Sequence, residues 1–590
     1  MASHLEQTQW GPDAVDQSPA SFLKNPDDPH YYITQAEARY AGAPKYNIDP
    51  FTPEEVDAAI KQLKKGKAPG PDGLKSETLK CLSDVNRPLV VSLMNVWWYT
   101  KRLPDDELEA AVIPIFKKGD PRVLDNYRPI SLLTTLNKLY AILIRGRLQD
   151  TADENLPATF FGFRKGKSTA DAIHIIRRIQ EKAEIGHTPC HIILLDWSKA
   201  FDRIRIPKLL EALRRHGIHE ELIEAVASLY RSPSFTVTEH GCTSAKHRQH
   251  RGIRQGCPLS PFLFVILMSA LMWDAEHDPE RTTHRDKLKR QLGFADLCYA
   301  DDTALFGFSY KEVEQSLQAI ERQAGSYGMS LNKSKCIHIS MYSRARVKFS
   351  DGSPVPTADE ATYLGAHINN AMDPRQEIIQ RLKKCSVIWR KLGLFWKQVP
   401  VSNKFKLLVH NAIIRSTLMY GLEAMQIPED LLKRMDAFQL KGIRQILKIT
   451  TTFVDRSHTN KFVIQQANKA LRYTSPTLMD RKLRKKKALK KFRQVTLFSK
   501  FVKVRSQKFM AHVIRADPDD PIRISTLQRS KIKPRLPRKR RVGRPRLNWS
   551  NITLAEMWLK ARPTTIQADF DPNSRRHNLY LLAAARNRIF

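Results

Sequence analysis

The spacing of apolar residues predicts a mixture of helices and short strands along most of the chain. Apolar positions that recur every three to four residues predict helices, and short apolar runs bounded by turn residues predict strands. A helix-start signal, Thr52 followed by Pro53 and acidic residues, opens the first helix, which should run to about Lys64. Further helices are predicted over 74–100, 132–149, 169–184, 207–231, 261–273 and 310–327. Strands are predicted over 111–116, 191–196, 335–341 and 363–368, and hairpins over 234–251 and 294–308.

The two ends of the chain have other patterns. Residues 1–50 contain Pro, Asp and Gly with little periodicity, which predicts an irregular segment. Residues 375–448 again have helical periodicity, and Lys and Arg become frequent beyond 456. We therefore expect an α+β fold. Its predicted divisions are an irregular segment at 1–50, a mixed unit at 51–190, a strand-bearing unit at 191–370, a helical unit at 371–455 and a basic, mainly helical extension at 456–590.

The charge balance points to a polyanionic partner. The 590 residues include 98 Lys and Arg against 60 Asp and Glu, a formal net charge of +38. So basic a chain favours nucleic acid as the partner, with an anionic membrane surface as the weaker alternative. No apolar run approaches the length needed to span a bilayer, so we expect no membrane partner. The start of the chain lacks a secretory pattern and the seven cysteines are scattered, which predicts a nuclear and/or cytoplasmic location.

Three aspartates interrupt the predicted strands. Asp196 ends the apolar run 192–195, and the adjacent Asp301 and Asp302 lie inside the hairpin 294–308. A buried carboxylate is strongly disfavoured unless it is paired or bound to a metal. Magnesium prefers oxygen ligands and keeps positions open for phosphate oxygens, and two such ions can stabilise both oxygens of a phosphoryl transfer. The pattern indicates a magnesium-dependent nucleotidyl transferase.

Several motifs, taken in their order along the chain, resemble one family. They lie at 126–131, 161–169, 194–202, 252–261, 299–302 and 328–335. Between residues 55 and 450 the chain resembles the reverse transcriptases of non-LTR (LINE-type) retrotransposons. The resemblance implies a right-hand polymerase, with fingers at 51–190, a palm at 191–370 and a thumb at 371–455. It also implies RNA-directed DNA synthesis, with an RNA template, a DNA primer and deoxynucleoside triphosphates as partners.

The same resemblance assigns the reacting centre. It makes Asp196 and Asp301 ligands of two Mg2+ ions, with Asp302 beside them and Mn2+ able to substitute. A bulky ring at Phe201 would pack under the incoming sugar and leave no room for a 2′-hydroxyl. Lys335 would protonate the leaving pyrophosphate, and general acid catalysis of this kind is typically worth about 10²–10⁴-fold in rate.

Other residues are assigned to the incoming nucleotide. Arg128 would contact the triphosphate, because Arg suits bidentate contact with phosphate. Either Lys117 or Lys118 would assist it, and the sequence does not distinguish between them. Gln255 would offer its amide to the template base or the nucleotide, and Gly256 would let the backbone approach a ligand closely.

Basic segments extend the expected contacts with nucleic acid. The Gly-rich loops 68–73 and 161–169 are expected to lie against its backbone, and the basic runs 481–493 and 531–546 to neutralise its phosphates. Two alternatives stay open. A group II intron maturase-like reverse transcriptase shares the polymerase core, and a catalytically inactive derivative would only bind nucleic acid. The sequence does not indicate the template RNA or the oligomeric state.

Overall fold

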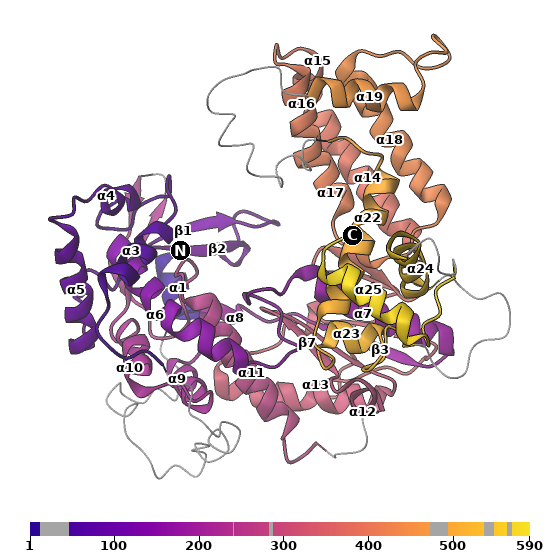
Figure 1. Ribbon diagram of the computed structural model, residues 1–590. Helices are drawn as coiled ribbons and strands as arrows, with labels where there is room; N and C mark the ends of the chain where they lie inside the picture. Colours follow the sequence, from indigo (N-terminus) through magenta and orange to yellow (C-terminus); the bar gives the residue numbers. More distant parts are fainter. Residues whose placement is uncertain (12–45, 240, 282–286, 472–493, 536–547, 563–568) are drawn as a thin grey trace.

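The computed structural model describes residues 1–11, 46–239, 241–281, 287–471, 494–535, 548–562 and 569–590. The ribbon has an open outline (Figure 1). Two sheets with their helices form its base and one of its sides, and a column of helices forms the opposite side. The fold is mixed helix and sheet, as expected. Within the described ranges no helix combines the length and the apolar character needed to cross a lipid bilayer.

A four-stranded antiparallel sheet, the central sheet, has the strand order β7–β8–β3–β9. Its strands are β3 (Cys190–Leu195), β7 (Asp296–Tyr299), β8 (Asp302–Gly307) and β9 (Ile337–Met341). Ile193 packs with α11 (Ser260–Glu276) and α13 (Tyr310–Ala324), whereas Ile192 packs with α7 (Thr169–Gly186). Because helices cover both faces of the central sheet, its inner strands β3 and β8 are continuous apolar runs in the sequence.

A second sheet stands beside the central sheet. In it β1 (Glu109–Phe116) pairs antiparallel with β2 (Tyr127–Leu133) and parallel with β4 (Ser234–Glu239). Two short strands, β5 (Cys242–Thr243) and β6 (His247–Arg248), pair with β4. The helices of this part are α3 (Pro53–Gln62), α4 (Ser76–Lys80), α5 (Arg87–Thr100), α6 (Thr135–Asn155), α8 (Ala200–Arg203), α9 (Ile206–Arg215) and α10 (Glu220–Ser228).

The helical column follows a hairpin of β10 (Glu360–Tyr363) and β11 (Ala366–Asn369). Its helices are α14 (Pro374–Lys391), α15 (Gly393–Lys397), α16 (Asn403–His410), the π-helix η5 (Asn411–Arg415), α17 (Ser416–Met419), α18 (Glu429–Leu447) and α19 (Asn460–Leu471). The basic run 481–493 and most of the run 531–546 lie outside the described residues.

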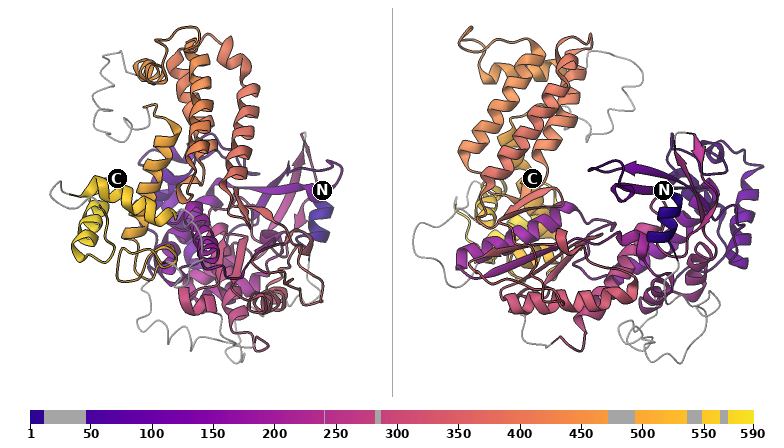
Figure 2. Two further views of the ribbon diagram at one scale, coloured as in Figure 1. Left: turned by 90° about the vertical axis from the view of Figure 1, so that its right-hand side faces the viewer. Right: turned by 180° about the vertical axis from the view of Figure 1, so that it is seen from behind.

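The chain then returns to the base of the column. Its last helices are α22 (Phe498–Arg515), α23 (Pro521–Thr526), α24 (Trp549–Ala561) and α25 (Arg575–Arg586). Figure 2 shows these helices, in orange to yellow, grouped beside the central sheet rather than extending from the molecule. A short helix, α12 (Lys287–Leu292), precedes β7.

The N-terminal segment differs from the expectation. Residues 1–11 are not irregular, because α1 (Ala2–Thr8) forms there and buries Leu5 against the second sheet. Trp10 meets Phe235 of β4 edge to face, with ring centroids 4.6 Å apart. This segment is helical because the second sheet supplies an apolar surface, a tertiary contact that local periodicity does not reveal.

Three predicted elements are also placed differently. The helix expected at 74–100 is two helices, α4 and α5, separated by turn-forming residues. The helix expected at 207–231 ends and restarts at Gly217, whose φ of 68° is left-handed. Strand β2 was missed, and the helix expected from 132 begins only at Thr135. By contrast, the Thr52–Glu55 capping box at the start of α3 is present as predicted.

Candidate active site

Three aspartates share one edge of the central sheet. Strand β3 pairs with β8 in a register that places Asp196, the residue after β3, opposite Asp302. Tyr299 of β7 pairs with Asp302, so the turn between the two strands consists of Ala300 and Asp301. Ala300 has a left-handed φ of 57°, as a tight turn requires. Segments far apart in the sequence therefore bring the three aspartates together, as the sequence predicted.

The three carboxylates act on one another electrostatically. Burial and repulsion from Asp301 and Asp196 raise the pKa of Asp302 to about 6. Burial also raises the pKa of Asp301, Asp196 adds to the rise, and Arg128 of the second sheet opposes it. Like charges held this close favour either a proton or a bound cation. No three His, Cys, Asp or Glu side chains among the described residues form a ready metal-binding cluster, so ligation by these aspartates stays a prediction.

Lys335 reaches the aspartate edge. Its Nζ lies 3.9 Å from Oδ2 of Asp196, and its side chain is 65% exposed. Lys333 instead pairs with Asp351 and Glu321 at 2.8 and 3.0 Å. Of the two lysines in the motif at 328–335, Lys335 is the one placed to exchange a proton beside the aspartates.

Basic side chains of the second sheet face the same edge. Arg128 lies on β2, and Lys117 directly follows β1. Partial burial lowers the pKa of Lys117, and Arg128, Lys335 and Lys199 lower it further because they are nearby cations. These four side chains therefore form one basic group, of which Arg128 and Lys335 act directly on the aspartates.

The two adjacent lysines have different surroundings. Both residues are exposed, and the side chain of Lys118 makes no ion pair or hydrogen bond with the described part of the chain. Lys117 lies within the basic group, so it fits the predicted contact with a triphosphate better. Lys199, which the sequence analysis did not single out, has a left-handed φ of 52° and pairs with Asp125 at 2.7 Å. Its only sequence signal is its position just after Asp196.

The loop before α11 is held by the protein itself. The Nε2 amide of Gln255 donates to both carboxylate oxygens of Asp202 at 3.0 Å. Burial raises the pKa of Asp202 to about 6, and the hydrogen bond from Gln255 opposes this rise. A Cβ on Gly256 would lie 2.2 Å from the carbonyl oxygen of Ser131. The close approach that we expected at Gly256 is thus made by β2, and the amide nitrogen of Gln255 is already engaged.

The ring of Phe201 is held rigidly. It stacks on Phe264 of α11 with centroids 4.4 Å apart and an interplanar angle of 8°. The backbone carbonyl of Phe201 also accepts a hydrogen bond from the N–H of Ile253 at 2.8 Å. A fixed ring is what a steric filter for the sugar needs, although that role stays a prediction.

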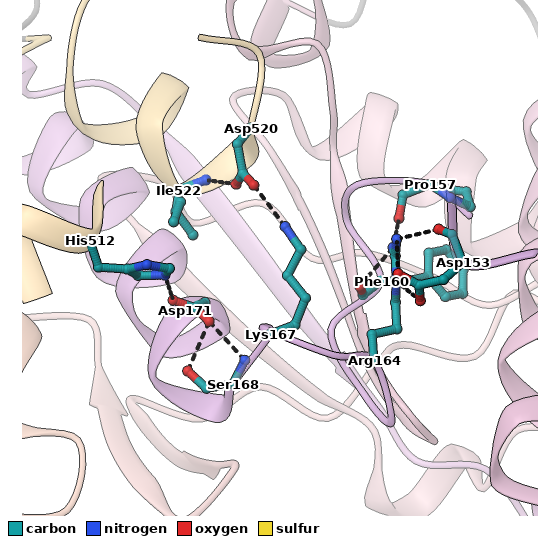
Figure 3. Close-up of polar contacts among 10 residues, drawn as sticks. All are labelled: Asp153, Pro157, Phe160, Arg164, Lys167, Ser168, Asp171, His512, Asp520 and Ile522. Carbon is teal, nitrogen blue, oxygen red and sulfur yellow. Dashed lines mark hydrogen bonds and ion pairs between the residues drawn. The ribbon is translucent and has the colours of Figure 1, made fainter. Parts of the chain in front are cut away.

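The loop at 161–169 differs from its predicted use. Arg164 donates to the carboxylate of Asp153 at 2.8 Å, and Lys167 pairs with Asp520 at 2.7 Å (Figure 3). Both basic side chains, which we expected to face nucleic acid, are bound to acidic residues of the protein. The sequence could not show this, because Asp520 lies in the distant C-terminal region.

Comparison with known proteins identifies the central part of the chain. Residues 115–368 match the family described as "Reverse transcriptase (RNA-dependent DNA polymerase)". The matched range contains the aspartate edge, the basic group and Phe201.

Curated relatives give the same result. The chain is 27% identical over 416 residues to the "RNA-directed DNA polymerase from mobile element jockey" of Drosophila funebris, which covers 68% of this chain and 44% of that protein. It is 24% identical over 437 residues to the "Transposon TX1 uncharacterized 149 kDa protein" of Xenopus laevis (72% and 33%). It is 26% identical over 428 residues to the "Probable RNA-directed DNA polymerase from transposon BS" of Drosophila melanogaster (68% and 45%).

The chain therefore spans less than half the length of these relatives. The family match lies inside the range of the sequence resemblance, 55–450, and contains the motifs from 126–131 to 328–335. Residues 115–368 are thus similar to the reverse transcriptase family, and about two thirds of the chain is similar to RNA-directed DNA polymerases of mobile elements.

Proposed function

We propose that this chain is an active RNA-directed DNA polymerase that extends a primer 3′-hydroxyl on an RNA template. The observation that carries the proposal is the convergence of Asp196, Asp301 and Asp302 on one sheet edge, beside Arg128 and Lys335, with Lys117 in the same basic group. Acids that bind cations and bases that bind a triphosphate must lie next to each other for nucleotidyl transfer. Its substrates are deoxynucleoside triphosphates.

The proposed architecture is a right hand. The central sheet with α11 and α13 would be the palm, the second sheet with α3 to α6 the fingers, and the column from α14 to α18 the thumb. The open outline between the column and the second sheet supports this assignment (Figure 1). The palm and the thumb follow α3 to α6 in the order that the resemblance implies, but β4 to β6 of the second sheet lie between β3 and α11 in the chain.

The aspartate edge has the chemistry of a divalent-cation site. Reverse transcriptases generally use divalent metal ions, and three neighbouring carboxylates that repel one another suit a hard cation. We propose that Asp196 and Asp301 hold two Mg2+ ions, with Asp302 beside them. Bound ions would supply charge stabilisation for the attacking and leaving oxygens.

The protein's own side chains would do the remaining work. Arg128 and Lys117 would bind and orient the triphosphate, since cations aimed at its oxygens neutralise the charge that develops on pyrophosphate. Lys335 would hold the proton that the leaving group accepts. Phe201 would close the space under the sugar and so favour deoxynucleotides.

Primer extension on an RNA template tests the proposal. The full chain with Mg2+ and deoxynucleotides should extend a DNA primer. Asp301→Ala should reduce extension by at least about 10³-fold, because it removes charge stabilisation at the reacting centre. Asp84→Ala is the matched control, since Asp84 is fully exposed in the turn between α4 and α5. Failure of the unaltered chain to extend any primer while it still binds nucleic acid would favour the inactive derivative.

A further inference from the structure

The C-terminal helices build part of the core over the central sheet. Together α22, α23, α24 and α25, here called the C-terminal module, have a core of their own that includes Met510, Trp549 and Trp558. Ile522 and Ile524 of α23 are not part of that core. They pack in the apolar cluster on the α7 face of the central sheet. A segment at the far end of the chain thus covers the sheet that carries the aspartates.

Polar contacts fix the same module to the segment before α7 and to the first turn of α7 (Figure 3). Lys167 Nζ lies 2.7 Å from Oδ2 of Asp520, and the two side chains are only 19% and 18% exposed. His512 Nε2 lies 3.1 Å from Oδ1 of Asp171, whose side chain is 2% exposed. The other oxygen of Asp171 accepts hydrogen bonds from the backbone N–H and the hydroxyl of Ser168. Ion pairs shielded from water in this way are stronger than exposed ones, and breaking one partner is costly.

The other end of that segment lies against the turn that carries Asp301. The N–H of Phe161 donates to the carbonyl of Cys298 at 2.8 Å, and the N–H of Cys298 donates to the carbonyl of Thr159 at 3.0 Å. A Cβ on Gly162 would lie only 2.3 Å from the backbone nitrogen of Ala300. One continuous segment, residues 159–171, therefore touches the aspartate turn at one end and the C-terminal module at the other.

We propose that the C-terminal module positions the aspartate turn for catalysis by clamping residues 159–171 through the Lys167–Asp520 pair. Lys167 and Asp520 are positioning residues, since neither contacts the reacting centre. The β7–β8 turn contains one left-handed residue, Ala300, and the segment packed against it restricts its movement. Displacements of about 1 Å at a reacting centre can cost about 10²-fold in rate.

The test uses a charge reversal and its suppressor in the full chain. Lys167→Glu places two carboxylates together and should release the segment. Asp520→Asn should suppress that effect, because it removes the repulsion while Asn still caps α23 through the hydrogen bond that Asp520 now accepts from Ile522. Asp519→Lys is the matched control, since Asp519 is 77% exposed and pairs with Arg529 inside the module.

Two readouts separate this inference from the proposed polymerase function on which it rests. Hydrogen exchange of a peptide that covers 296–303 should become faster in Lys167→Glu and return towards the original rate in the double variant. In primer extension, Lys167→Glu should lower kcat about tenfold with the KM for deoxynucleotides changed less than about twofold, and the double variant should recover most of the loss.

The inference is overturned if Lys167→Glu leaves both the exchange at 296–303 and kcat unchanged. It is also overturned if a correctly folded double variant is no better than Lys167→Glu. If the unaltered chain fails to extend primers, the polymerase proposal fails, and hydrogen exchange alone still decides whether the module holds the turn.

Discussion

Lys117 and Lys118 are adjacent in the chain but differ in what surrounds them. Burial lowers the pKa of Lys117, and the nearby cations Arg128, Lys199 and Lys335 lower it further. A triphosphate bound here would offset the repulsion among these cations, as our proposal requires. The structure therefore supports Lys117 over Lys118 for the proposed contact, a choice that the sequence left open.

Replacing each lysine by Ala should show which of the two contacts the nucleotide. Lys117→Ala should raise the KM for deoxynucleotides about tenfold, because a charge-assisted contact with phosphate is worth about 1.5–3 kcal/mol. Lys118→Ala is the control and should change the KM less than about twofold. Steady-state primer extension measures both values. Equal effects of the two substitutions would remove Lys117 from the nucleotide site.

At the scale of elements, residues 159–171 pack so closely against the β7–β8 turn that no space remains for an added methyl group at Gly162. Gly162→Ala would insert a methyl group 2.3 Å from the nitrogen of Ala300, so either the turn or the segment must move. We expect extension activity to fall about 10²-fold while the protein stays folded, because the clash lies at one sheet edge. Gly146→Ala is the control, since a Cβ there meets nothing within 4 Å. Circular dichroism and extension assays compare the two, and full activity in Gly162→Ala would show that the turn tolerates displacement.

Two neighbouring strands also share a pair of buried histidines. His191 of β3 and His338 of β9 have ring nitrogens 3.0 Å apart, and burial lowers the pKa of each to about 4. Unfolded histidine titrates near 6.5, so between about pH 6.5 and pH 4 the unfolded chain binds protons that the folded chain does not. The free energy of unfolding should therefore fall as the pH falls through this window, on the order of 2 kcal/mol for each histidine between pH 7 and pH 5.

Urea unfolding at several pH values measures this effect. A variant with Leu at both positions 191 and 338 cannot take up those protons, so its free energy of unfolding should depend less on pH than that of the unaltered chain. An identical pH dependence in the two proteins would assign the acid sensitivity to other groups.

Elements were predictable where their signal is local. Strand β3 and the β7–β8 hairpin are continuous apolar runs, and α3 begins with a capping box, so each carries its own evidence. Strand β2 and helix α1 depend on surfaces supplied by other segments, and α23, although it begins with Asp520 and Pro521, is too short to show apolar periodicity. The three aspartates were predictable because they adjoin apolar runs, whereas the engagement of Gln255 by Asp202 required the folded chain.

For the whole molecule, the site is assembled from parts that span almost the entire chain. The central sheet brings the aspartates, the second sheet brings Arg128 and Lys117, and the C-terminal module covers the sheet from behind. The region beyond 456 was expected to be a basic nucleic-acid-binding extension. Of its described helices, α23 packs against α7 and the central sheet, whereas α19 and the start of α22 pack with the helical column. No sequence pattern indicates that Ile522 packs against the central sheet, so the packing of the C-terminal module on this sheet was not predicted.

The net charge of +38 gives the last prediction, which concerns the molecule as a polycation. Binding to an RNA–DNA duplex releases counterions from each phosphate that a Lys or Arg neutralises. A protein with six to ten such contacts loses about 10³–10⁵-fold in affinity between 50 and 200 mM salt. We expect a loss of at least about 10³-fold, independent of duplex sequence, in fluorescence anisotropy without divalent metal. Asp301→Ala should bind at least as tightly as the unaltered chain, because it removes a negative charge beside the basic group. Affinity that is insensitive to salt would mean that few of the excess cations contact phosphate. Weaker binding by Asp301→Ala would mean that Asp301 maintains the structure of the surface that binds nucleic acid rather than taking part in the reaction.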